Sequence, residues 1–217
     1  MNKYFIGMTV CLLLCFLLVG CRIEKKGKDT AVPIDNAALE PDFPDSYMIE
    51  DNNYFDYQTG LECSAFASAY LLRHYGIEAT GLELFKDYPG KLTDGTGVSP
   101  QGIETFFYGQ GYEAKFICNA TVEELKQEVA KGAPVIVFIH TVDPEVNLHY
   151  THYVPVVGYD ETYFYFAESL SDLANCKDEE NLPYNRKTDI ETFKKIWENI
   201  EGYWDYPYFS IKPQDDE

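Results

Sequence analysis

Three short apolar runs follow one another between residues 134 and 169, and they constrain the fold more than any other feature of this chain. They read PVIVFIH, HYVPVVGY and YFYFAES, and they are rich in the β-branched and aromatic residues that are common in strands. Helix-like patterns precede them. This order predicts an α+β fold in which an N-terminal helix packs against a mostly antiparallel sheet.

The helix-like segments are recognised by their apolar periodicity and by the residues at their ends. Residues 63–75 carry an apolar stripe and stop before Gly76. Further helices are expected over 100–108 and after two capping boxes, Thr121 with Glu124 and Thr188 with Glu191. Strands are expected at 113–117 and in the C-terminal segment YWDYPYFSI, whereas 77–98 is interpreted as irregular surface structure.

The N-terminus reads as an export signal, because a lysine precedes an apolar run. The segment LVGC at 18–21 resembles the lipobox of bacterial lipoproteins, which implies that Cys21 is lipidated and anchors the protein to the extracytoplasmic face of the cell membrane. An ordinary signal peptide or a short membrane anchor is the alternative, although a span needs roughly 20 apolar residues. We assign 1–20 to a lipoprotein signal peptide, 21–46 to a flexible tether and 47–217 to one folded domain.

The chain is strongly acidic, with 36 acidic and 17 basic residues and a formal net charge of −19. Nucleic acids and anionic lipids are bound by basic clusters, so we expect no nucleic-acid partner and membrane contact through the lipid anchor alone. The 18 Tyr and 14 Phe residues exclude disorder of the main body. No motif typical of a metal or phosphate site occurs, so no metal or cofactor is implied, and we expect a monomer.

Cys63 stands where a polar, glycine-containing turn becomes the first predicted helix, in QTGLECSAFASAYLLRHYG. The unpaired N–H groups and the helix dipole at this position favour a thiolate, which makes Cys63 a candidate nucleophile. The alternative is a small core residue. Cys118 and Cys176 are the other cysteines of the predicted domain, and a disulfide between them is arithmetically possible.

A nucleophilic thiolate needs a histidine within reach, and four are available. His74 lies on the helix of the cysteine, about 16 Å along its axis, and is too far away. His140 and His149 are interpreted as surface residues at and after a strand end. His152 opens HYVPVVGYD, and Glu168 ends the next run, so antiparallel pairing of these two strands would bring the two side chains together.

The order Gln58, Cys63, His152, Glu168, with a helix after the cysteine and HYVPVVGYD after the histidine, resembles the bacteriocin-processing (double-glycine leader) cysteine peptidases and their secreted relatives. The resemblance covers roughly residues 54–169 and implies a papain-like fold. It also implies that Cys63 is the nucleophile and His152 the general base and acid. Glu168 would orient the imidazole, and the Gln58 amide would join the Cys63 backbone N–H in an oxyanion hole.

The third residue of that family is usually an aspartate before a proline, whereas this chain has Glu168 followed by Ser169. A glutamate can also orient an imidazole, from one methylene further away. Asp160 is another carboxylate that could be proposed as the third member. However, GYD reads as the hairpin turn between two strands, so we assign Asp160 a structural role.

These residues predict a surface-anchored thiol hydrolase, a cysteine peptidase that acts on a peptide or protein substrate without a cofactor. An amidase or an acyl transferase on the same fold would start from the same cysteine and histidine, so both remain alternatives. A catalytically inactive papain-like binding module is a further alternative. In that case the acidic, tyrosine-rich surface would matter and Cys63 would not.

Overall fold

The computed structural model describes residues 43–93, 95, 97–143, 148–176 and 182–214. The predicted signal peptide and lipidated Cys21 lie outside the described residues, as does the predicted tether up to residue 42. The side chain of His149 also lies outside them.

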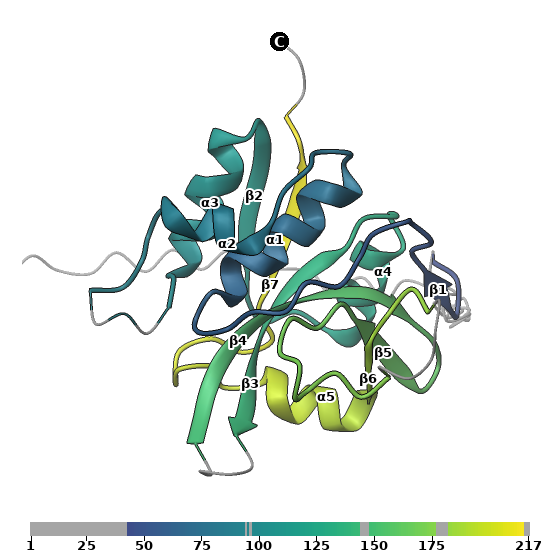
Figure 1. Cartoon of the computed structure of the whole chain (residues 1–217). Helices are drawn as coiled ribbons and strands as arrows, with labels where there is room; N and C mark the ends of the chain where they lie inside the picture. Colours follow the sequence, from purple (N-terminus) through teal and green to yellow (C-terminus); the bar gives the residue numbers. More distant parts are fainter. Residues whose placement is uncertain (1–42, 94, 96, 144–147, 177–181, 215–217) are drawn as a thin grey trace, which may run out of the picture. The chain divides into compact units, whose positions relative to one another are not determined.

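The described chain forms an α+β fold, as predicted from the sequence (Figure 1). Its helices are α1 (Cys63–His74), α2 (Gly81–Lys86), α3 (Pro100–Gly109), α4 (Val122–Val129) and α5 (Ile190–Trp197). Its strands are β1 (Tyr47–Met48), β2 (Tyr112–Ile117), β3 (Val135–Asp143), β4 (Leu148–Tyr159), β5 (Tyr163–Phe166), β6 (Arg186–Asp189) and β7 (Tyr208–Pro213). The sheet order is β2-β7-β3-β4-β5-β6, with β1 beside β4, and each strand pairing among the described residues is antiparallel.

Alternating side chains of β3 divide the apolar interior into two cores. Ile136 and Phe138 enter the core that α1 and α3 cover, while Val135, Val137 and Ile139 enter the core that contains α4 and α5. This alternation is the period of two that strands impose on their side chains. Figure 1 accordingly shows α1, α2 and α3 gathered on one side of the long strands, with α5 on the other. The sheet therefore lies between two layers of helices.

Helix α1 is almost entirely buried, from Ser64 to Leu72. Small residues on α1 allow this close packing, since Ala65 and Ala69 are both 0% exposed. Gly76 follows its C-terminus with φ of 80°, a conformation that glycine adopts without strain. The position of the N-terminal residue of this helix is thus determined by the core.

The two predicted capping boxes have different outcomes. The first is confirmed, because the Thr121 hydroxyl accepts from the Glu124 N–H at 3.1 Å and the Glu124 carboxylate accepts from the Thr121 N–H at 2.7 Å. The second is wrong. Thr188 belongs to β6, and α5 is capped one residue later by Asp189, whose carboxylate accepts a first-turn N–H at 2.9 Å. Pairing with β5 keeps the chain extended through residue 188, which delays the start of the helix.

Three other local predictions were resolved by the structure. The interpretation of 77–98 as irregular was wrong in part, because this segment contains helix α2, which follows the N-cap residue Thr80. Asp160 is in the β4–β5 turn as predicted, where its carboxylate accepts two backbone N–H groups at 2.7 Å and 2.6 Å. Cys118 and Cys176 are not bridged to one another.

Residues at the start of the described chain contact the domain. The Tyr159 hydroxyl donates to the Pro44 carbonyl at 2.9 Å, and the Phe43 ring lies edge-on to Tyr159 with 6.3 Å between centroids. The predicted tether therefore makes contacts at its C-terminal end. Among the helices of the described residues, none combines the length and hydrophobicity that a membrane span requires.

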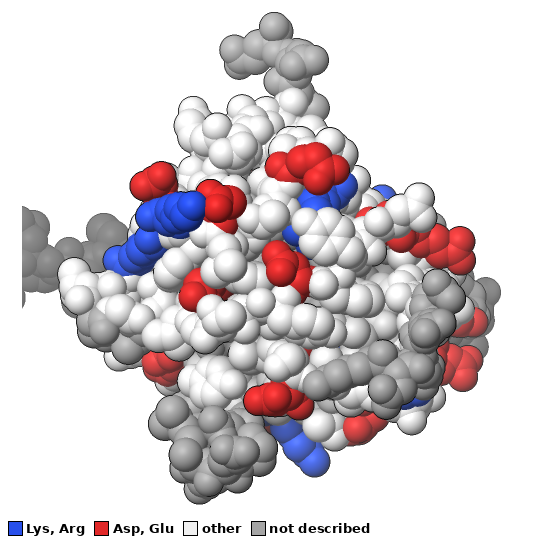
Figure 2. All heavy atoms as spheres, viewed as in Figure 1, with Lys and Arg blue, Asp and Glu red and all other residues white. Residues whose placement is uncertain are grey.

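Acidic side chains are spread over the face shown in Figure 2, whereas basic ones gather at a few places. This distribution agrees with the formal net charge of −19.

Candidate active site

Cys63 is the first residue of α1 and is half-buried. The N-cap residue Glu62 makes no side-chain hydrogen bond to the helix, and the first turn contains no acidic residue. The first N–H groups of the helix therefore lack a side-chain cap, and the Glu62 carboxylate accepts from the Gly60 N–H at 2.7 Å instead.

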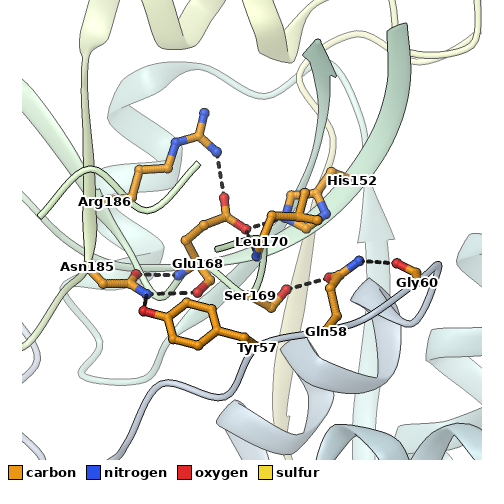
Figure 3. Close-up of polar contacts among 9 residues, drawn as sticks. All are labelled: Tyr57, Gln58, Gly60, His152, Glu168, Ser169, Leu170, Asn185 and Arg186. Atoms are coloured by element: carbon orange, nitrogen blue, oxygen red, sulfur yellow. Dashed lines mark hydrogen bonds and ion pairs between the residues drawn. The ribbon is translucent and has the colours of Figure 1, made fainter. Parts of the chain in front are cut away.

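His152 lies on β4 with only 1% of its surface exposed. Its Nε2 is 2.8 Å from Glu168 Oε1 (Figure 3), and Cys63 is near enough to the imidazole to influence its pKa. Because Nε2 is bonded to the carboxylate, Nδ1 is the nitrogen left for the thiol. Burial disfavours the imidazolium, but the charge of Glu168 and the interaction with Cys63 outweigh burial and raise the pKa of His152.

Glu168 follows β5, and its side chain is 0% exposed. Its Oε1 also accepts from the Leu170 N–H at 2.8 Å, and its Oε2 accepts from Arg186 Nη1 at 2.7 Å. Burial disfavours the carboxylate, but the positive charge and hydrogen bond of His152, together with Arg186, lower the pKa of Glu168. The structure thus brings Cys63, His152 and Glu168 together, with the carboxylate ionised.

Asn185 and Arg186 support Glu168, and the sequence analysis did not identify either of them. The Asn185 side chain accepts from the Glu168 N–H at 2.7 Å and donates to the Glu168 carbonyl at 2.8 Å, so it holds the backbone on both sides (Figure 3). Arg186 faces Phe166 in the β5–β6 register. The polar segment NRKT carries no periodic signal that predicts this pairing, so only the folded chain reveals the contact.

Gln58 lies beside Ser169, the residue that follows Glu168. Its backbone N–H donates to the Ser169 carbonyl at 2.9 Å, and its Oε1 accepts from the Ser169 hydroxyl at 2.7 Å. Its Nε2 donates to the Gly60 carbonyl at 2.7 Å. A primary amide has two N–H donors, so one is left for a ligand beside the start of α1. The oxyanion role of Gln58 stays a prediction.

The other histidines with described side chains are bonded elsewhere. His74 Nδ1 is 2.8 Å from Asp51 Oδ2 at the far end of α1, and His140 Nε2 is 3.2 Å from the Asn199 carbonyl. Within the described ranges, no group of three or more His, Cys, Asp and Glu side chains is arranged to hold a metal ion. The arrangement provides a thiol, an imidazole and an ionised carboxylate in series, which can perform nucleophilic acyl transfer.

Comparison with known proteins identifies the fold. The family model described as the Peptidase_C39 like family matches residues 51–204. A structure described as a C39-like peptidase from Bacillus anthracis has a TM-score of 0.55 at 17% identity, covering 78% of this chain and 98% of that one. None of the curated proteins compared with the chain matches it.

Two further solved structures are similar. The peptidase domain of Streptococcus ComA, described as a bi-functional ABC transporter, has a TM-score of 0.52 at 16% identity and covers 74% of this chain and 98% of that one. A double glycine motif protease from an AMS/PCAT transporter, solved in complex with the leader peptide, has a TM-score of 0.52 at 19% identity. The match covers 77% of this chain and 94% of that one. At these identities the likeness establishes the fold, which is papain-like.

Proposed function

This chain belongs to the Peptidase_C39 like family, and from that membership we propose that it is a cysteine peptidase that hydrolyses peptide bonds. The observation that carries the proposal is the continuous series of contacts from Cys63 through His152 to the buried carboxylate of Glu168. A substrate peptide fits the similarity to a double glycine motif protease that was solved with its leader peptide. We further propose that lipid on Cys21 holds the enzyme at the extracytoplasmic face of the membrane.

In the proposed reaction, His152 accepts the thiol proton and the Cys63 sulfur attacks the carbonyl carbon of the scissile bond. His152 then gives that proton to the leaving amine, and an acyl-enzyme remains. Water attacks the thioester while His152 acts as base, which releases the acid and restores the thiol. Glu168 stabilises each imidazolium through Nε2, and the Gln58 amide and the Cys63 N–H would stabilise the oxyanion.

The test is cleavage of a peptide library by the full chain, read by mass spectrometry of the new peptide ends. We expect products from the native chain and from Cys118→Ser, a matched loss of a thiol outside the site. Cys63→Ser should give none, because a hydroxyl is far harder to ionise. Cleavage that survives Cys63→Ser would exclude the thiol mechanism.

Products also separate the alternative reactions. An acyl transferase would give peptides joined to an added amine in place of free acids, since both reactions share the acyl-enzyme. A folded chain that alkylates slowly at Cys63 and cleaves nothing would instead be an inactive binding module.

A further inference from the structure

The second oxygen of the Glu168 carboxylate is bonded to an arginine that the proposed reaction does not use. Arg186 Nη1 donates to Glu168 Oε2 at 2.7 Å, while Glu168 Oε1 is hydrogen-bonded to His152 Nε2 at 2.8 Å. The Arg186 side chain is 11% exposed and that of Glu168 is 0% exposed. The guanidinium also lies over the Phe166 ring, 5.5 Å from its centroid. The contact is therefore a buried ion pair directly behind the imidazole.

The charges of this site balance only when Arg186 is included. After His152 has accepted the thiol proton in the proposed reaction, the charges of the sulfur and the imidazolium cancel, which leaves the negative charge of Glu168 to be offset by Arg186. The balance changes during the proposed reaction. Once His152 has given its proton to the leaving amine, the imidazole is neutral and Arg186 is the positive partner that the buried carboxylate retains.

A buried carboxylate without a charged partner takes up a proton. A protonated Glu168 would no longer stabilise the imidazolium that must form again when water attacks the acyl-enzyme. We propose that Arg186 is a positioning residue that acts through Glu168, keeping its carboxylate ionised toward His152 while the imidazole is neutral. This inference rests on the proposed function.

The shape of the carboxylate site does not depend on Arg186 alone. Asn185 holds the Glu168 backbone at two points, and the Leu170 N–H holds Oε1. What Arg186 adds to these neutral contacts is a full positive charge. Removing that charge should therefore change ionisation more than geometry.

Other ionisable groups face Glu168 across a small cavity, namely Asp56, Tyr70 and Arg73. Arg73 is bonded to the Asn53 side chain and to two backbone carbonyls. Among the described residues, the charged groups that bond the Glu168 carboxylate are His152 and Arg186. The test can thus be directed at one side chain.

The experiment measures kcat/KM and kcat against pH for the full chain, Arg186→Gln and Arg186→Lys. Without Arg186 the buried Glu168 carboxylate should take up a proton and stop stabilising the imidazolium, so the alkaline limb of the Arg186→Gln profile should move to lower pH by about one unit. Arg186→Lys should keep the native limbs, because the native contact uses a single nitrogen. Lys187→Gln, one residue along β6, is the matched charge-loss control and should also keep them.

Two outcomes would overturn the inference. One is a loss of turnover at every pH with both limbs unmoved, which would indicate a purely structural role. The other is an Arg186→Lys profile that shifts as far as that of Arg186→Gln.

If Arg186→Gln does not fold, the comparison moves to Glu168→Gln, in which the target of Arg186 carries no charge. Adding Arg186→Gln to Glu168→Gln should then leave turnover equal or higher. A further fall would show that Arg186 acts by another route and would overturn the inference.

A measurement without substrate separates this inference from the proposed function. The His152 ring resonance, assigned as the one lost in His152→Asn, should titrate at lower pH in Arg186→Gln, because Glu168 loses its charge, and at the native pH in Arg186→Lys. This result can be obtained even if no peptide is cleaved. An unmoved or raised midpoint in a folded Arg186→Gln chain would overturn the inference about Arg186 while leaving the proposed peptidase activity untouched.

Discussion

His152 Nε2 and Glu168 Oε1 are 2.8 Å apart, with side chains that are 1% and 0% exposed. The β4–β5 pairing brings together these two residues, which lie 16 positions apart in the chain. Low exposure strengthens their electrostatic interaction, because water does not screen it. The pair therefore contributes to both the proposed chemistry and the stability of the domain.

His152→Ala should lose peptidase activity by about 10²–10⁴-fold, because it removes both the proton acceptor and the proton donor of the reaction. His74→Ala is the matched loss of an imidazole at the opposite end of α1. It should alter stability through its lost Asp51 contact and leave turnover near native. The measurement is kcat and kcat/KM of both variants on one cleaved peptide. A His152→Ala variant with native activity would disprove the assignment of His152 as the base.

Glu168→Gln should be milder, with a loss of turnover of about tenfold, because a neutral hydrogen bond replaces a charge-assisted one. The same change leaves Arg186 without its ion-pair partner in a buried site. We therefore also expect the free energy of unfolding to fall by about 3–5 kcal/mol, measured by denaturant titration. A variant as inactive as His152→Ala would mean that the carboxylate does more than orient the ring.

Ser169→Ala should lower kcat by about threefold to tenfold, because it removes the hydroxyl that holds Gln58 Oε1. Gln58→Ala should cost more, about 10²-fold, if its amide serves the oxyanion. The two effects should not add, since the serine acts through the glutamine. Ser171→Ala, whose hydroxyl contacts Asp172 on the exposed surface, is the control. If the losses of kcat in the two single variants add fully in the double variant, Ser169 does not act through Gln58.

The pair also predicts how stability depends on pH. The pKa of His152 is raised by folding, so its stabilisation is complete below roughly pH 6.5 and is lost as pH rises through the folded value. The pKa of Glu168 is lowered by folding, so its stabilisation is present above roughly pH 4.3 and is lost as pH falls through the folded value. The Tm difference between the native chain and the double variant His152→Asn/Glu168→Gln should be largest between these limits. A difference that does not vary with pH would contradict the coupling.

Cys21→Ala should move the protein from the membrane fraction to the soluble fraction, because the proposed lipid is its anchor and a net charge of −19 offers no electrostatic replacement. Cys15→Ala is the matched control and should remain in the membrane fraction, since it leaves the segment LVGC intact. Immunoblots of fractionated cells provide the readout. A Cys21→Ala chain that stays with the membrane would show a different anchor.

The sequence by itself determined the elements whose signals are local. The helix that begins at Cys63, the capping box at Thr121 and the strand that begins near His152 all follow from periodicity and end residues within a few positions. The pairing of His152 with Glu168 was also predictable, because a short hairpin leaves one register for two adjacent runs. Asp160 in that turn follows from the same reasoning.

Only the tertiary structure decided what surrounds Glu168. Asn185 and Arg186 reach it because β6 pairs with β5, and Asp189 caps α5 in place of Thr188 for the same reason. Periodicity along a chain reports which side of a strand is buried, and it contains no information on which distant segment lies alongside. A buried ion pair such as Glu168 with Arg186 depends on that neighbour, because charges leave water only where a partner is within a few ångströms.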